Sequence, residues 1–158
     1  MRKLILYFLI YIIFCLIQFF FSQYLNSFRI FPNFILVCVV CIGFIKGSFN
    51  AQLVGFLFGL TWDIFSTDVF ATRALLFTIL GYLSGKLNRK FDIINTFFQC
   101  VIVFLANIVY DLGLYLINCI IIQDFKDTLT FKNISNIFTT TIVTPFVFYV
   151  LRRVLKGI

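Results

Sequence analysis

"GFLFGLTWDIF", residues 55–65, is an apolar stretch that carries a single carboxylate. Gly55, Gly59 and Asp63 recur every four residues, so a helix places all three near one face. A carboxylate within lipid costs free energy and usually faces the protein interior. The stretch therefore predicts a membrane helix whose glycine and aspartate face packs against another helix.

The composition of the whole chain is that of a membrane protein. Of the 158 residues, 62% are hydrophobic and 12% are charged, whereas an average soluble domain has about 25% charged residues. The mean hydropathy is +1.07. No segment resembles a separate soluble domain, so we expect one integral membrane domain over residues 1–158.

Six apolar segments predict an all-α, polytopic bundle of about six transmembrane helices. About 20 helical residues span the hydrocarbon core, and the second to fourth segments are shorter, so a re-entrant pair is an alternative there. The first segment is not followed by the cleavage site of a signal peptide, and we expect it to be retained. Pro145 is expected to kink the last segment. The segments cover residues 4–21, 33–46, 50–66, 72–88, 94–123 and 134–151.

The basic residues indicate how the chain is oriented. The net charge is +7, from 13 Lys and Arg residues and 6 acids. With six spans, nine basic residues lie on the side of both termini and four on the other side. By the positive-inside rule, both termini are expected in the cytoplasm. Because the charges cluster at segment ends, they fit a membrane topology better than a nucleic-acid surface.

The sequence carries no recognisable catalytic or metal-binding set. It has no His, and it lacks the HExxH, Walker A and Ser-His-Asp patterns. Cys38 and Cys41 have C-x-x-C spacing inside an apolar run, without the second Cys pair or His of a zinc site. We therefore predict a protein that is not an enzyme and that uses no metal or cofactor.

Asp63 lies near the outer end of the third segment, and Arg73 begins the fourth segment after a short turn. The two side chains are expected to form an ion pair that closes this helical hairpin. A contact with a ligand or a partner is the alternative interpretation.

Asp111 lies near the middle of the fifth segment. At about 100° per residue, Cys100, Asn107, Asp111 and Asn118 share one narrow face, which should point into the bundle. These groups form either an interhelical hydrogen-bond cluster or a polar site that a ligand or partner uses, and the sequence leaves both interpretations open.

The glycines are spaced for close helix packing. Gly55 and Gly59, and likewise Gly81 and Gly85, form small-xxx-small motifs that let two backbones approach closely in lipid. We expect these motifs to pack the third and fourth segments together; a dimer interface is the alternative.

Residues 32–90 resemble the MreD family of rod shape-determining membrane proteins. The resemblance lies in Pro32 followed by an amide, in the pattern G-F-x-x-G-L-x-x-D at 55–63, and in a helix that ends in Gly81 and Gly85. A basic cluster at 86–90 follows, as it does in the family.

The chain departs from the family pattern at two places. Many members carry Asp where this chain has Asn33. Many also carry Pro-Leu-Gly in the turn after the aspartate, where this chain has Val69-Phe70-Ala71.

The resemblance implies a non-enzymatic subunit of the bacterial cell-elongation machinery, in the cytoplasmic (inner) membrane, acting in rod shape and peptidoglycan synthesis. The implied partners are the bitopic protein MreC, the MreB filament and the peptidoglycan synthases, with anionic lipids at the basic loops. The family fold is also similar to S-components, so a substrate-binding S-component of an energy-coupling vitamin-uptake transporter is the alternative function. The candidate packing and partner-binding residues are Pro32, Gly55, Gly59, Asp63, Arg73, Gly81, Gly85, Asn107 and Asp111.

Overall fold

The computed structural model describes residues 12–16, 18–20, 32–65, 69–88, 96–121 and 131–156. All regular secondary structure in these ranges is helical, which confirms the all-α prediction. Residues 12–16 and 18–20 are helical within the first predicted segment. Of the basic cluster at 86–90, residues 89 and 90 lie outside the described residues. The labelled helices are α2 (Phe34–Lys46), α3 (Ser48–Phe65), α4 (Thr72–Asn88), α5 (Thr96–Ile121) and α6 (Phe131–Lys156).

The helix bounds follow the predicted segments closely, with one exception. The last helix begins at Phe131 and ends at Lys156, so it is longer than the predicted segment 134–151. It continues through Pro145.

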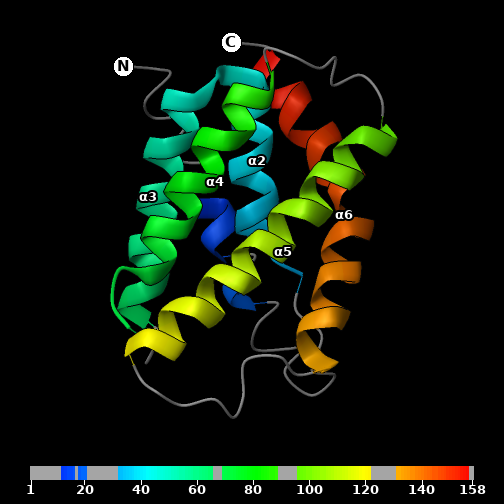
Figure 1. Cartoon of the computed structure of the whole chain (residues 1–158). Coiled ribbons are helices and arrows are strands. Elements are labelled where there is room, and N and C mark those ends of the chain that lie inside the picture. The colour runs from blue at the N-terminus through cyan, green and yellow to red at the C-terminus, as the bar shows by residue number, and fades with distance from the viewer. Residues whose placement is uncertain are drawn as a thin grey trace.

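α2 is the central helix of the bundle (Figure 1). Every residue from Phe34 to Phe44 is buried, and α3, α4, α5 and α6 all contact this helix. Its sequence is apolar on all sides, and a helix of that kind is stable only when it is surrounded. With 13 residues, α2 is about 20 Å long. This length is less than the thickness of a hydrocarbon core.

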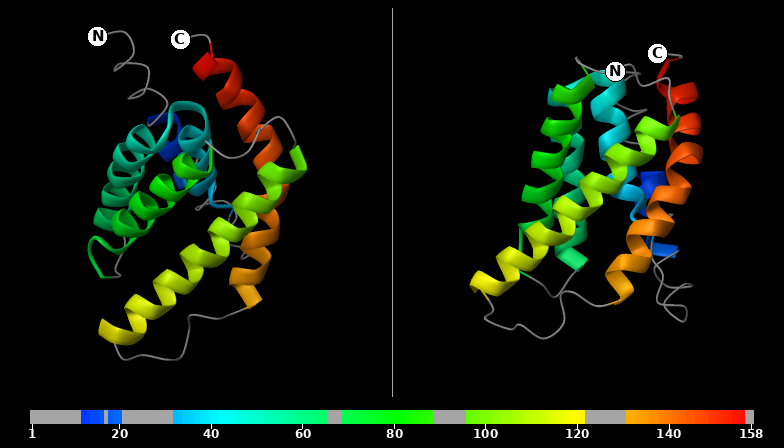
Figure 2. Two further views of the ribbon diagram at one scale, coloured as in Figure 1. Left: turned by 45° about the horizontal axis from the view of Figure 1, so that its top comes forward. Right: turned by 45° about the vertical axis from the view of Figure 1, so that its right-hand side comes forward.

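The other helices are arranged around α2 in alternating directions. α3 and α4 lie side by side as a hairpin, while α5 crosses the bundle diagonally between α4 and α6 (Figures 1 and 2). The C-terminal ends of α2, α4 and α6 therefore lie at one end of the bundle. The opposite end holds the turn between α3 and α4.

The outer surface of the bundle is apolar and its interior contains polar groups. Phe65 on α3, Phe97 on α5 and Ile142 on α6 are each more than 70% exposed. The buried polar residues include Asp63, Gln99, Asn107 and Thr140. Within the described residues, α5 is the helix that is both long and apolar enough to cross a membrane.

Candidate functional site

Asp63 holds the start of α4 against the end of α3. Its carboxylate accepts hydrogen bonds from the backbone N–H groups of Arg73 (3.3 Å) and Ala74 (3.0 Å). The first N–H groups of a helix have no partner within the helix, and the positive end of the helix dipole favours an anion. The guanidinium of Arg73 also lies 3.8 Å from Asp63, so the expected ion pair is present. The backbone contacts are nevertheless the shorter ones.

The glycine motifs join α3 and α4 along their whole length. A methyl group on Gly55 or Gly59 would overlap the backbone of α4, at Phe77 and Ala74 respectively. In the same way, a methyl group on Gly81 would come within 2.6 Å of the Ala51 carbonyl oxygen on α3. The expected packing of these two helices is therefore present, and the glycine faces lie inside the protein.

Gly85 extends this packing to the far end of the hairpin, where a methyl group would overlap the backbone of Ser48. Gly43 of α2 lies against Ser84 and Gly85. The closest approach of backbones thus involves α2 as well as the hairpin.

The start of α2 is buried and is held by two other parts of the chain. Pro32 is buried, and the side chain of Asn33 accepts a hydrogen bond from the first turn of α2 (3.0 Å). The Asn33 N–H donates to Thr140 Oγ1 on α6 (2.9 Å). The Phe34 N–H donates to Gln18 Oε1 in the first segment (3.0 Å). These contacts satisfy helix N–H groups that would otherwise be costly to bury.

A polar cavity of about 230 Å³ lies next to the start of α2 and the start of α4. Its walls bring together residues from the first segment and from all five labelled helices or their caps. Opposite charges, amides and aromatic rings all contribute to the lining. The lining residues are Gln18, Asn33, Ile35, Trp62, Arg73, Phe77, Asn107, Tyr110, Asp111 and Asn136.

Arg73 connects the hairpin turn to this polar cavity. Its guanidinium faces Asp63 on one side and interacts with the Tyr110 hydroxyl of α5. Tyr110 is buried and stacks on Phe77 of α4, with ring centroids 5.0 Å apart and planes 2° apart. One basic side chain therefore contacts groups from α3 and α5.

The predicted polar face of α5 is divided in the structure. Asn107 and Asp111 line the polar cavity. Asn107 is buried and its amide donates to the Val103 carbonyl one turn earlier (3.0 Å). Cys100 instead donates from Sγ to the Thr141 carbonyl oxygen of α6 (3.8 Å). Within the described part of the chain, the Asp111 carboxylate forms no hydrogen bond or ion pair.

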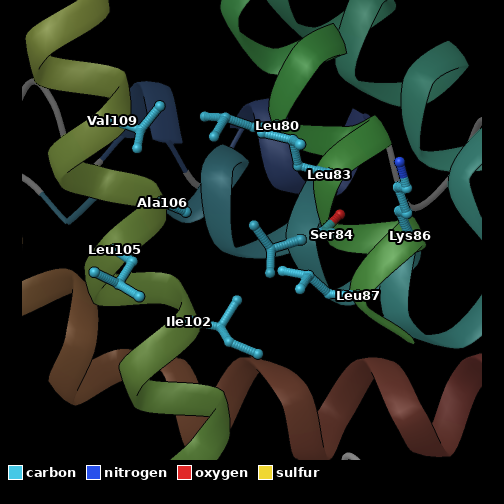
Figure 3. Close-up of a pocket in the computed structure, with 10 residues that line it drawn as sticks. Leu80, Leu83, Ser84, Lys86, Leu87, Ile102, Leu105, Ala106 and Val109 are labelled. Atoms are coloured by element: carbon cyan, nitrogen blue, oxygen red, sulfur yellow. The ribbon is translucent and has the colours of Figure 1, made fainter. Parts of the chain in front are cut away.

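A second, apolar groove of about 350 Å³ lies on the other side of the α4–α5 contact. Figure 3 shows leucine side chains of α4 facing α5 across the groove, whereas Lys86 points away from α5. The Lys86 amine lies over the Tyr82 ring of α4, 5.9 Å from the ring centroid. Val40 of α2 also contributes to the lining. The two helices contact each other at Leu76 and Gly113 and separate towards this groove. The groove is lined by Val40, Leu80, Leu83, Ser84, Lys86, Leu87, Ile102, Leu105, Ala106 and Val109.

Sequence reasoning did not identify four of the polar residues at this site: Gln18, Asn33 as a cap, Asn136 and Thr140. Gln18 is a lone polar residue in an apolar run, and Thr140 is one of three consecutive threonines, so spacing alone does not single out these residues. Among the residues that the structure describes, no three His, Cys, Asp or Glu side chains are placed to hold a metal ion. Cys38 and Cys41 are free and buried on α2.

Comparison with models of known protein families identifies a relationship for this chain. The model of the family described as rod shape-determining protein MreD matches residues 2–154, which is nearly the whole chain. No curated protein and no solved structure matches the chain significantly. A match of this length covers both the hairpin and the polar cavity, and the chain belongs to the MreD family of rod shape-determining proteins, which are integral proteins of the inner membrane.

Proposed function

We propose that the described helices and the first segment form a polytopic bundle of six transmembrane helices with both termini in the cytoplasm. The observation that supports it is the distribution of side chains, because large apolar residues cover the outside while Asp63, Asn107 and Thr140 are buried. A bundle surrounded by lipid has this arrangement, since polar groups are costly against acyl chains.

The basic side chains support the proposed orientation. Lys46 and Lys86 lie in the last turns of α2 and α4. Arg152 and Arg153 lie near the end of α6, at the same end of the bundle (Figure 1). An excess of Lys and Arg marks the cytoplasmic side, and these residues are also placed to attract anionic lipids.

We further propose that the protein is a non-enzymatic subunit of the cell-elongation machinery that binds an MreC-like bitopic protein. Through this partner it acts with the MreB filament and the peptidoglycan synthases. The apolar groove between α4 and α5 supports this function, because a single apolar helix gains packing contacts where two neighbouring helices separate. Lys86, in the last turn of α4, lies at the proposed cytoplasmic end of the bundle, where it suits an acidic juxtamembrane segment of the partner.

A site-specific crosslinking experiment tests the proposed partner. A photoreactive amino acid is placed in the groove, at Leu83 or Leu105, in the native membrane of the source bacterium. Matched controls carry it at Leu53 on α3 or Ile142 on α6, which are exposed apolar positions outside the groove. We expect the groove positions to crosslink an MreC-like protein more strongly than the controls, and we expect depletion of the protein to round the cells.

Equal crosslinking from all four positions would contradict the groove as the binding surface. Recovery of a transporter ATPase without any cell-wall protein would contradict the proposed function. The family match does not favour the transporter alternative.

A further inference from the structure

The charges at the polar cavity are unequally compensated. The negative charge of Asp63 is compensated by Arg73 and by the first N–H groups of α4. Asp111 lies on the same cavity and has no ion pair within the described residues. A carboxylate in a medium of low dielectric constant is stable when a cation or several donors compensate it.

The rest of the lining is suited to an anionic oxygen. Arg73 carries five N–H donors in a fixed fork, so it can contact several acceptors at once. The Tyr110 hydroxyl and the amides of Asn107 and Asn136 supply further donors and acceptors. Trp62 adds an aromatic wall to the same cavity.

The size of the cavity limits what it can hold. Its 230 Å³ corresponds to about seven or eight water molecules at about 30 Å³ each. This volume suits a small molecule or a lipid headgroup, and it is too small for a folded peptide segment with its side chains.

We propose that the polar cavity binds a small zwitterion, whose ammonium group pairs with Asp111 and whose anionic oxygen pairs with Arg73. A phosphoethanolamine group has this chemistry, either as the headgroup of a membrane lipid or as a free molecule. The placement of the cavity near a membrane surface rests on the proposed bundle topology. The binding itself is independent of whether an MreC-like partner uses the apolar groove.

Ligand binding to the purified full-length protein tests the proposal. The probes are dihexanoyl phosphatidylethanolamine, dihexanoyl phosphatidylcholine, dihexanoyl phosphatidylglycerol and soluble O-phosphoethanolamine, each added to protein in maltoside micelles. Binding is measured by native mass spectrometry and by the shift in melting temperature. We expect the phosphatidylethanolamine to bind about tenfold more tightly than the other two lipids, because only its ammonium group donates N–H bonds to a carboxylate.

The soluble probe distinguishes the two sources of the zwitterion. Binding of O-phosphoethanolamine as well as the lipid supports a site for free zwitterions. Binding of the lipid alone supports a headgroup site. Equal binding of the three lipids, or no binding of any probe, would overturn the proposal.

The variant Asp111→Asn removes the negative charge and keeps the shape of the side chain. We expect it to lose the preference for phosphatidylethanolamine, with about a tenfold weaker affinity. Cys100→Ser is the matched control, since it lies on the same helix outside the cavity lining, and it should bind as the unmodified protein does. An unchanged preference in Asp111→Asn would overturn the proposal. If this variant does not fold, the order of binding of the three lipids to the unmodified protein decides the question.

Discussion

The contact between α3 and α4 differs sharply from the contact between α4 and α5. The first is closed along its length, with Gly55, Gly59 and Gly81 against backbone atoms of the facing helix and Asp63 at the start of α4. The second is made at a few places, such as Gly113 against Leu76, and it leaves a cavity on each side. α4 therefore has one face for rigid packing and one face that remains accessible.

This difference indicates how a small helical protein in lipid divides its surfaces. Lipid tails are as apolar as leucine, so helices associate through close packing and hydrogen bonds. Where glycine permits close backbone approach, the two helices are fixed as one unit. Where larger side chains keep the helices apart, space remains for a ligand or a partner, and both proposed sites are found beside α5.

The largest expected effect comes from adding one methyl group to the closed contact. Gly59→Ala places a Cβ against the backbone of Ala74, which cannot move without shifting α4. We expect a loss of about 3 kcal/mol in the free energy of unfolding, at the upper end of overpacking effects. Denaturation in mixed micelles, followed by circular dichroism, measures the change.

Gly113→Ala makes the same chemical change at the open contact. Its added methyl would meet the end of the flexible Leu76 side chain, which can rotate away. The expected change is smaller than about 1 kcal/mol, because better helix propensity offsets the small rearrangement. Equal losses in the two variants would mean that the α4–α5 contact is as rigid as the α3–α4 contact, and would contradict the proposed difference between them.

The two carboxylates provide a second test of the same difference. Asp63→Asn weakens two hydrogen bonds to the first turn of α4 and removes a charge that the helix dipole favours. We expect a loss of about 2 kcal/mol in the free energy of unfolding. Thermal unfolding of the purified protein in detergent provides the measurement.

Asp111→Asn makes the same chemical change on α5, in the polar cavity between α4 and α5. Because Asp111 has no hydrogen bond or ion pair within the described residues, neutralising its uncompensated charge removes no contact, and we expect the variant to be at least as stable as the unmodified protein. A loss as large as that of Asp63→Asn would indicate that Asp111 is part of the structural framework rather than of a binding site.

The contact between α3 and α4 was largely predictable from sequence. Gly55, Gly59 and Asp63 lie four residues apart, and a helix necessarily places them on one face. The apolar runs set the positions of α2 to α5, and the short turn brings Asp63 close to Arg73. These are local or nearly local relationships, which spacing can express.

The polar cavity beside α5 was less predictable, because it depends on contacts between distant segments. Asn107 and Asp111 were recognised as polar residues facing inward, yet nothing in their spacing indicates Gln18 or Asn136 as neighbours. The short turn predicts the pairing of Arg73 with Asp63, with a ligand or partner contact as the alternative, but it does not indicate the interaction with Tyr110. The diagonal path of α5 determines these contacts (Figure 2), and helix crossing depends on packing along the whole interface.

The turn that closes the hairpin gives an expected effect of the opposite sign. Ala71 has a φ of 69°, a left-handed conformation that costs an alanine about 1–2 kcal/mol. Ala71→Gly relieves this strain, although glycine also increases the entropy of the unfolded chain by about 0.4–1 kcal/mol. We expect a net gain of up to about 1 kcal/mol, seen as a higher melting temperature. Ala106→Gly, within α5, should instead lower stability by about 1 kcal/mol, and a loss from both changes would show that residue 71 is not strained by its conformation.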